Sequence, residues 1–348
     1  MRAITVTPGR QGSAQLEEIG EPPESDGSVL VETLAVGICG TDLEINSGGY
    51  GWAPPGHERL VLGHESIGRV TEAPPGSGFA AGDLVAGIVR RPDPEPCYSC
   101  AAGEWDFCRN GRYTEHGIKE LDGFMRERYR AEPDALVKVD ASLGSLGVLL
   151  EPTSVVAKAW EEVERVGNRA TWKPRSAVVT GAGPIGLLAA LIGVQKGLEV
   201  HVIDQVSEGL KPSLVEELGA SYHTGPIEQA VDGPDIVLEC TGVASLVFDA
   251  FDHVGSGGVV CLTGVSGTGR TLSIDAGMVN RDMVLGNEAV VGSVNANRRH
   301  YEAAADALKR AERSWLAKLV TRSVPMEQFS SALEREQDDV KVVVEIGR

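Results

Sequence analysis

Residues 176–186, Ser176-Ala-Val-Val-Thr180-Gly181-Ala-Gly183-Pro184-Ile185-Gly186, carry the clearest structural pattern in the chain, together with the apolar run 187–194 that follows them. Residues 176–180 are short, apolar and rich in β-branched side chains, as expected of a strand covered on both faces. The first glycine permits a tight turn, the second lets the backbone approach a pyrophosphate, and the third lets helix and strand pack closely. The pattern predicts a dinucleotide site formed by Gly181, Gly183, Pro184, Ile185 and Gly186. A glycine turn without a ligand is the alternative that the pattern disfavours.

An acidic residue ends the next predicted strand. Asp204 lies eighteen residues past Gly186, where its carboxylate is expected to accept hydrogen bonds from both ribose hydroxyls of a bound dinucleotide and to repel a 2′-phosphate. NAD is therefore favoured, although Lys211 is close enough in sequence to leave NADP open. Thr241 and Gly264 follow later strands and are expected to line the nicotinamide end; for Thr241 an ordinary strand-to-helix turn is an equal alternative.

The order of predicted elements divides the chain into two domains. Strands alternate with helices from about residue 151 to 295, which predicts a parallel sheet with strands at 176–180, 199–204, 235–240, 258–263 and 289–294. The first 150 residues are rich in Gly and Pro with short alternating runs, typical of an antiparallel β domain. The tail reads helix, strand, helix and closing strand, too short to fold alone. We expect a catalytic domain over 1–155 with 298–348, and a dinucleotide-binding domain over 156–297.

Composition limits the classes of partner. The 348 residues contain 32 Lys and Arg against 50 Asp and Glu, a formal net charge of −18 that disfavours nucleic acid and anionic membrane surfaces. No stretch reaches the roughly 20 apolar residues of a membrane span, and the N-terminus lacks a signal-peptide core. A cytoplasmic protein is expected, and the clustering of its cysteines favours metal ligation over disulfides.

Two loops of the first domain carry metal-ligand residue types. Gly37-Ile-Cys39-Gly-Thr41-Asp42 and Gly63-His64-Glu65 supply a thiolate, an imidazole and a carboxylate, the ligands that zinc prefers. Taken singly, each motif is weak evidence for a metal site, because a lone cysteine is usually a core residue and a His-Glu pair in a loop is often a surface pair without a ligand. Beside a dinucleotide fold, the combination predicts a zinc site. A second cluster, Cys97, Cys100 and Cys108, also has a spacing that favours metal.

These segments, with Gly82-Asp-Leu-Val85 and the glycine turn, occur in an order that resembles the zinc-dependent medium-chain alcohol dehydrogenases over essentially the whole chain. Further segments look most like the glucose 1-dehydrogenases of archaea and bacteria: Arg90-Arg-Pro92, 117–125, Glu151-Pro152 and Gly292-Ser-Val-Asn295. The resemblance implies an α/β fold, with a Rossmann domain built on a parallel six-stranded sheet and a β-rich GroES-like catalytic domain. It also implies a homodimer or homotetramer.

The resemblance assigns roles residue by residue. Cys39, His64, Glu65 and Glu151 would surround the catalytic zinc, and Thr41 would relay a proton. Glu151 replaces a cysteine ligand of the ordinary alcohol dehydrogenases. Without the resemblance, Glu151 reads equally well as an acid that stabilises a helix N-terminus, and Thr41 as a turn cap.

The same comparison implies the substrate and the reaction. Glu115 and Asn295 would bind sugar hydroxyls, with Asn295 also at the cofactor, and Glu151 would contact the substrate as well as the zinc. Ser154 departs from the sugar enzymes and leaves the exact sugar open. The implied reaction moves a hydride from the anomeric carbon of an aldose to NAD(P) and gives a lactone, in a dry cleft between domains. Another polyol or secondary alcohol as substrate, and a cofactor-binding protein without activity, are the alternatives.

The cysteine cluster departs from the family pattern. Cys97, Cys100 and Cys108 match the last three of the four cysteines that bind a structural zinc in the family, and Pro94 stands in place of the first. The residues considered for a fourth ligand are Asp93, Glu95 and Asp106. An empty lobe is the other possibility.

Overall fold

The computed structural model describes residues 1–267 and 271–347; Arg348, the end of the expected catalytic domain, lies outside them. Backbone contacts divide the chain into two compact units. Met1–Ser154 and Ala296–Arg348 form one, called here the split unit, and Val155–Asn295 form the other, the central unit. No helix in the described residues is both long and apolar enough to cross a membrane.

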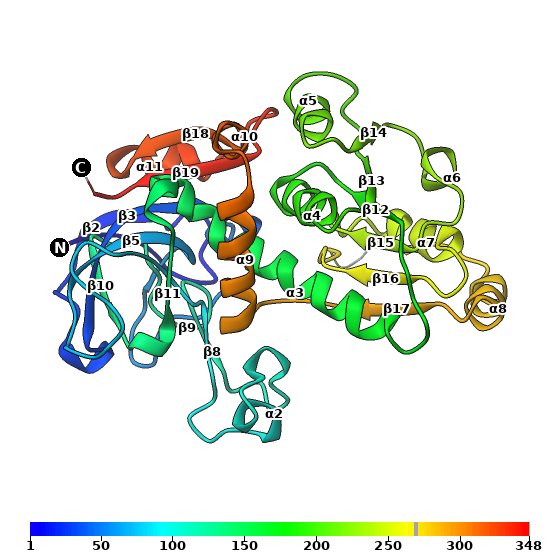
Figure 1. The fold of residues 1–348 in the computed structure, drawn as a ribbon. Coiled ribbons are helices and arrows are strands. Elements are labelled where there is room, and N and C mark those ends of the chain that lie inside the picture. Colours follow the sequence, from blue (N-terminus) through cyan, green and yellow to red (C-terminus); the bar gives the residue numbers. More distant parts are fainter. Residues whose placement is uncertain (268–270, 348) are drawn as a thin grey trace. The chain divides into compact units, whose positions relative to one another are not determined.

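The split unit is built around a seven-stranded sheet in the order β11-β6-β5-β3-β19-β18, with β10 also paired to β3. The long strand β3 (Val29–Ile38) pairs antiparallel with β5 (Glu65–Glu72), β10 (Arg128–Ala131) and β19 (Lys341–Glu345). The C-terminal strand therefore completes a sheet that begins near the N-terminus (Figure 1). The remaining strands of this sheet are β6 (Leu84–Gly87), β11 (Leu136–Lys138) and β18 (Val320–Pro325).

Smaller elements complete the split unit. One three-stranded sheet has the order β2-β1-β4 and another β7-β8-β9. These strands are β1 (Arg2–Val6), β2 (Gln15–Glu18), β4 (Leu60–Val61), β7 (Arg90–Arg91), β8 (Thr114–His116) and β9 (Glu120–Leu121). The α-helices are α1 (Gly40–Asn46), α2 (Tyr98–Ala101), α9 (Arg298–Arg310), α10 (Arg313–Leu319) and α11 (Phe329–Ala332). The expected order of the tail was wrong in one respect, because a second helix, α10, precedes β18.

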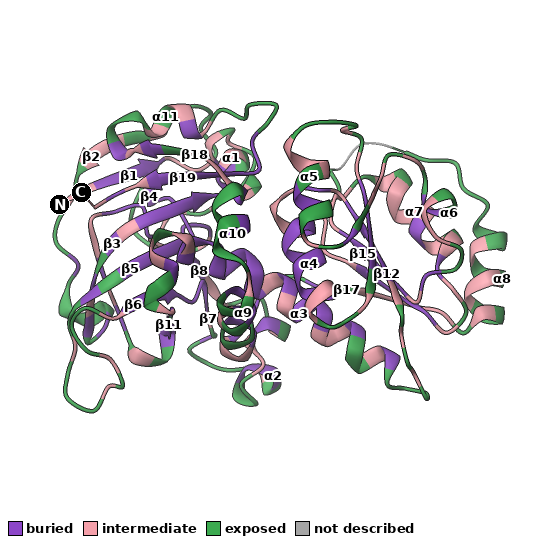
Figure 2. Cartoon of the chain, turned by 45° about the horizontal axis from the view of Figure 1, so that its top comes forward, coloured by how far each residue is buried: buried purple, intermediate pink, exposed green. Residues whose placement is uncertain are grey.

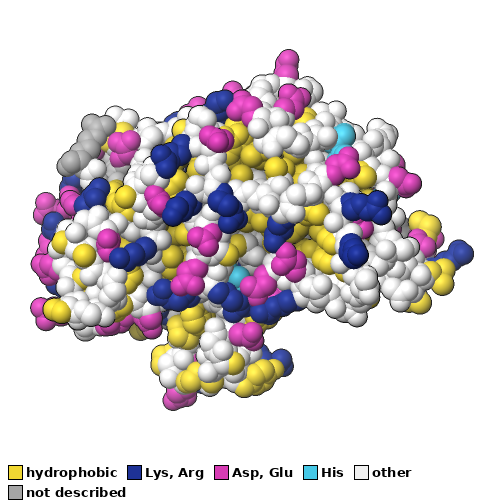
Figure 3. Space-filling model, viewed as in Figure 1, with side chains coloured by type: hydrophobic (Ala, Val, Ile, Leu, Met, Phe, Trp, Pro, Cys, Tyr) yellow, Lys and Arg dark blue, Asp and Glu magenta, His cyan; other side chains and the backbone are white. Residues whose placement is uncertain are grey.

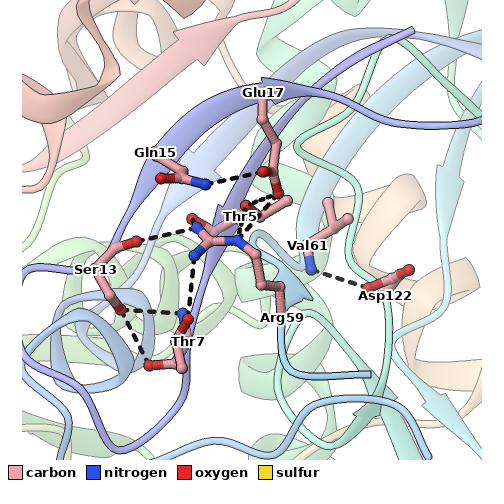
Figure 4. A network of polar contacts seen from close by, with 8 residues as sticks. All are labelled: Thr5, Thr7, Ser13, Gln15, Glu17, Arg59, Val61 and Asp122. Atoms are coloured by element: carbon pink, nitrogen blue, oxygen red, sulfur yellow. Dashed lines mark hydrogen bonds and ion pairs between the residues drawn. The ribbon is translucent and has the colours of Figure 1, made fainter. Parts of the chain in front are cut away.

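A polar network fastens the N-terminal strands to the rest of the split unit. The Arg59 guanidinium donates to the hydroxyl of Thr5 at 2.7 Å, to the hydroxyl of Thr7 at 3.1 Å and to the carbonyl of Ser13 at 3.0 Å (Figure 4). It also pairs with Glu17 at 3.0 Å. One side chain thus joins β1, β2 and the loop between them.

The central unit contains the predicted six-stranded parallel sheet, in the order β14-β13-β12-β15-β16-β17 (Figure 1). Its strands are β12 (Ser176–Thr180), β13 (Glu199–Ile203), β14 (Ser221–His223), β15 (Ile236–Glu239), β16 (Val259–Leu262) and β17 (Ala289–Gly292). The helices are α4 (Pro184–Gln195), α5 (Leu210–Glu217), α6 (Ile227–Ala230), α7 (Ala244–His253) and α8 (Ala276–Gly286). Helix α3 (Leu150–Gly167) begins in the split unit and continues into the central one.

Burial follows the sheets. The central strands of the two largest sheets are largely buried, whereas the strands β2, β14 and β17 and the helix α8 have no buried residue (Figure 2). On the face drawn in Figure 3, acidic side chains are interspersed with Lys and Arg, so the net negative charge is not gathered into one patch there. Five of the six parallel strands were predicted within two residues at each end; β14 was not, because Ser-Tyr-His carries no apolar pattern.

Candidate functional site

Cys39, His64 and Glu65 lie together in the split unit. Cys39 follows β3 and is the N-cap of α1, whereas His64 precedes β5 and Glu65 begins it. The antiparallel register pairs Gly37 with Glu65, which brings the two loops to the same end of the sheet. One ligand atom from each of Cys39, His64 and Glu65 lies within 4.8 Å of the other two.

Glycines make this approach possible. A Cβ on Gly37 would lie 2.1 Å from Oε2 of Glu65, so any side chain there would displace the carboxylate. Gly63 has φ +88° and a Cβ on it would lie 2.5 Å from the Met125 side chain. Both glycines in the predicted motifs are therefore required by contact or by backbone conformation.

Asp42 lies beside the imidazole of His64 and is bonded to the backbone of Cys39. It is fully buried, its Oδ2 accepts a hydrogen bond from the Cys39 amide at 2.9 Å, and its Oδ1 lies 3.6 Å from Nδ1 of His64. Burial lowers the pKa of His64, but the neighbouring Asp42 and Cys39 raise it more, and the net pKa is well above the ordinary value. A carboxylate beside Nδ1 leaves Nε2 as the metal-binding nitrogen, an arrangement typical of zinc-ligating histidines.

Lys341, which the sequence did not single out, is the cationic partner of Glu65. Its Nζ donates to the two carboxylate oxygens at 2.7 and 2.6 Å and to the carbonyl of Ile38 at 3.2 Å, and both side chains are 2% exposed. Burial lowers the pKa of Lys341, but Glu65 and Cys39 raise this pKa by more, so the net pKa lies above its usual value. Both oxygens of Glu65 are thus bound by one buried ammonium group.

Glu151 and Thr41 lie beside the cluster. Glu151, in the first turn of α3, is 8% exposed, and it is outside the group of three whose ligand atoms meet. Burial raises its pKa to about 7, against the lowering effect of His64. Thr41 Oγ1 lies 3.9 Å from the Cys39 sulfur. A thiolate, an imidazole and a carboxylate in reach of one another, with a second carboxyl nearby, form a donor set that fits zinc.

Of the three predicted substrate-binding residues, Glu115 and Glu151 belong to the split unit and Asn295 to the central unit. Glu115, on β8, is buried and its Oε1 accepts from Nε and Nη2 of Arg90 at 3.1 and 3.0 Å. Arg90 in turn lies 3.7 Å over the ring of Tyr113. Asn295 is the last residue of the central unit and adopts a left-handed backbone conformation, with φ +62°. Arg90 was quoted for the family resemblance, but its pairing with Glu115 was not foreseen.

The three cysteines of the second cluster also come together. Their sulfurs lie within 4.8 Å of one another, with Cys97 and Cys100 at 3.6 Å. Hydrogen bonding by the Arg109 amide lowers the pKa of Cys97 to about 6, whereas burial raises that of Cys100 to about 11. The cluster fits a soft metal with three thiol ligands.

The acids considered as a fourth ligand are engaged elsewhere. Asp93 accepts from Asn110 and pairs with Arg112 at 3.2 Å, and Glu95 pairs with the same arginine at 3.2 Å. Asp106 accepts from the Asn297 amide at 2.8 Å. Among residues 1–267 and 271–347, the group around these sulfurs contains only the three cysteines.

The glycine turn of the central unit has the geometry its sequence predicts. Gly181 has φ +88°, and a Cβ on Gly186 would lie 1.8 Å from the Gly181 carbonyl oxygen, so neither tolerates a side chain. Helix α4 begins at Pro184 with Gly183 as its N-cap, and Ile185 lies in the first turn. The unpaired amides of that turn are suited to a pyrophosphate.

Asp204 lies directly after β13 and contacts this turn. Its Oδ2 accepts from the Ala182 amide at 2.7 Å and its Oδ1 from the Val206 amide at 3.1 Å, and Lys211 lies 3.4 Å away. Burial raises the pKa of Asp204, but the two amides and Lys211 lower it more, so the net pKa is below the usual value. Thr241 and Gly264 follow β15 and β16 at the same carboxyl edge of the sheet.

Comparisons with known proteins agree with this geometry. Residues 25–141 match the model of the alcohol dehydrogenase GroES-like domain, and residues 144–346 match that of the glucose dehydrogenase C-terminus. The chain is 42% identical to a glucose 1-dehydrogenase of Methanocella arvoryzae and 40% identical to one of Thermoproteus tenax, with at least 99% of each chain covered.

A solved structure is similar over the full length of both chains. Haloferax mediterranei glucose dehydrogenase, in complex with NADP, Zn and gluconolactone, superposes with a TM-score of 0.92 at 32% identity. The family follows from two observations. Two family models match residues 25–141 and 144–346, and relatives more than 30% identical align over the whole chain. The chain belongs to the zinc-dependent medium-chain dehydrogenase family and resembles its glucose 1-dehydrogenases.

Proposed function

We propose that the protein is a zinc-dependent dehydrogenase that oxidises the anomeric carbon of an aldose such as glucose and reduces NAD or NADP, releasing a lactone. The observation that carries this proposal is the meeting of Cys39, His64 and Glu65 in the split unit. The names of the relatives and the lactone in the Haloferax structure support the choice of substrate.

The residues of the split unit would divide the work as follows. Cys39 and His64 would hold zinc, with Glu65 and Glu151 as carboxylate ligands. Bound zinc is a Lewis acid that lowers the pKa of the anomeric hydroxyl. Thr41 Oγ1, beside the Cys39 sulfur, would relay the proton released from that hydroxyl, accepting it while passing its own hydroxyl proton on to water.

Sugar recognition would depend on buried polar groups. Glu115 and Asn295 would bind the remaining hydroxyls, and Arg90 would keep the Glu115 carboxylate in place through its two hydrogen bonds. A site built to bind hydroxyls rejects analogues that lack them, because its own polar groups are then left unpaired.

NAD would be preferred and NADP accepted. The Asp204 carboxylate disfavours a 2′-phosphate, whereas Lys211, 3.4 Å from it, supplies a cation that can pair with one. The Haloferax relative was solved with NADP, which supports use of NADP.

We also propose a homodimer or homotetramer in the cytoplasm. Helix α8 exposes apolar side chains, with Met278, Val284 and Leu285 at least 50% exposed, more than an isolated monomer is expected to leave in water. All six cysteines are free, as expected in a reducing compartment. Sedimentation equilibrium would give the oligomeric state; a monomer at micromolar concentration would contradict this part of the proposal.

A substrate screen tests the proposed reaction. The zinc-loaded protein is assayed with glucose, galactose, xylose, sorbitol and threonine, each with NAD and with NADP, and the product is identified as lactone or ketone. We expect turnover of at least one aldose with lactone as product. Turnover of sorbitol or threonine alone would instead support a polyol or secondary-alcohol dehydrogenase, and binding of cofactor without any turnover would support a non-catalytic protein.

A further inference from the structure

A buried carboxylate stands at the ligand-binding edge of the central sheet. Glu239 is the last residue of β15, which lies between β12 and β16, and its side chain has no exposed surface. Within the described residues, no Lys, Arg or His lies within ion-pair distance of it. A buried carboxylate without a cation is costly unless its oxygens are well hydrogen-bonded, so its partners indicate what it does.

The side chain of Glu239 binds the turn that follows its own strand. Oε1 accepts from the Thr241 amide at 2.7 Å and also from the Thr241 hydroxyl. The Gly242 amide donates to both carboxylate oxygens at 3.1 Å. Across the sheet, the hydroxyl of Thr180 at the end of β12 donates to Oε1 at 3.2 Å.

The main chain of the same residue binds the next turn. The Glu239 carbonyl accepts from the amide and the hydroxyl of Thr263, both at 2.8 Å, and from the Gly264 amide at 3.1 Å. A Cβ on Gly264 would lie 2.1 Å from the Gly242 nitrogen and 2.8 Å from Oε2 of Glu239. The two turns are therefore packed backbone against backbone around one carboxylate.

These turns follow the carboxyl ends of neighbouring parallel strands, the edge at which open α/β sheets bind their ligands. We propose that Glu239 is a positioning residue that fixes the 241–242 and 263–264 turns against the nicotinamide end of the bound dinucleotide. The proposal rests on the proposed function. Glu239 makes no hydrogen bond to Asp204 or Ala182, the pair at the predicted adenosine end, and its one bond toward the glycine turn comes from Thr180, so we expect its main effect at the nicotinamide end.

Glu239→Gln tests this role, because it keeps the size of the side chain but replaces one acceptor oxygen with an amide donor that faces the Gly242 N–H. Affinities for NADH and for ADP-ribose, which lacks nicotinamide, are measured by titration calorimetry. We expect the dissociation constant of NADH to rise about tenfold, equivalent to about 1.4 kcal/mol, and that of ADP-ribose to change less than about twofold. The kcat of the zinc-loaded enzyme should fall more than its KM for sugar rises.

Asp235→Asn is the matched control. Asp235 precedes the same strand, and its Oδ2 accepts from the amides of Arg175 and Ser176 at 2.7 and 3.1 Å, but at the opposite end of the sheet. This control should lower the melting temperature but change the affinities for NADH and ADP-ribose by the same factor. If Glu239→Gln does not fold, Glu239→Asp is measured in its place.

The outcomes are distinct. Equal weakening of NADH and ADP-ribose, or no weakening of either, would overturn the positioning role. Failure of the unmodified protein to bind NADH would count against the proposed function itself. A selective loss of NADH affinity together with a lower kcat supports the inference, because a loss of general stability alone would not distinguish two ligands that share the adenosine and pyrophosphate groups.

Discussion

Lys341→Met removes the cation that faces Glu65 while nearly preserving the volume of the side chain. The Lys341 ammonium donates to both oxygens of Glu65 at 2.7 and 2.6 Å, with both side chains 2% exposed. Breaking a buried ion pair at one partner costs about 3–5 kcal/mol, because the other charge stays buried and unpaired. We expect the metal-free variant to lose about that much free energy of unfolding.

Zinc should offset part of this loss. A divalent cation held by Cys39 and His64 supplies the positive charge that Glu65 has lost, so the difference between variant and unmodified protein should shrink when zinc is saturating. Urea titration with and without zinc measures both differences. Lys138→Met, which breaks the exposed 2.8 Å pair with Asp83, is the control and should cost less than about 1 kcal/mol.

Two results would refute this reasoning. A loss below about 1 kcal/mol for the metal-free Lys341→Met variant would mean that Glu65 does not need its ammonium partner. An equal loss with and without zinc would mean that Glu65 does not interact with the metal.

Three further predictions follow from the site and its surroundings. Cys39→Ser or His64→Ala should abolish turnover while NADH still binds, as calorimetry would record; undiminished turnover would contradict the zinc assignment. Asp204→Ala should erode the preference for NAD. An unchanged ratio of the kcat/KM values for NAD and NADP would mean that Asp204 does not set the cofactor preference. Burial raises the pKa of Asp339, but Arg322 lowers it more. The pair's stabilisation is therefore present above the ordinary value of 3.8 and lost as pH falls through the lower folded pKa. The loss of melting temperature caused by Asp339→Asn should be largest near neutral pH and should fade in acid. A loss that stays the same at every pH would mean that the charge of Asp339 does not stabilise the fold.

Local sequence patterns predicted most of the strands of the central unit. The strand, glycine turn and helix from Ser176 to Gln195 are specified by neighbouring residues, so the sequence predicts them well. Strand β14 was missed because its three residues are paired to β13 by tertiary structure and have no apolar alternation of their own. In the tail, α10 was missed because its seven residues are too few to set a clear helical period.

The sequence predicted which residues form the metal site, but not the hydrogen bonds and ion pairs that surround them. Cys39, His64 and Glu65 are recognisable by their chemistry and by the glycines around them. Lys341 lies 276 residues beyond Glu65 and meets it only because β19 pairs with β3, a register that the sequence does not reveal. Glu239 lay inside the predicted strand 235–240 and was not singled out, because its proposed role depends on donors at the ends of two other strands.

Anomalous X-ray scattering at the zinc edge, on crystals of the active zinc-loaded protein, would locate the catalytic metal itself. We predict a peak about 2.3 Å from the Cys39 sulfur and about 2.0–2.1 Å from Nε2 of His64, with a carboxylate oxygen of Glu65 or Glu151 within about 2.2 Å. Active crystals with no zinc peak between Cys39 and His64 would show that the reaction does not use zinc at this site.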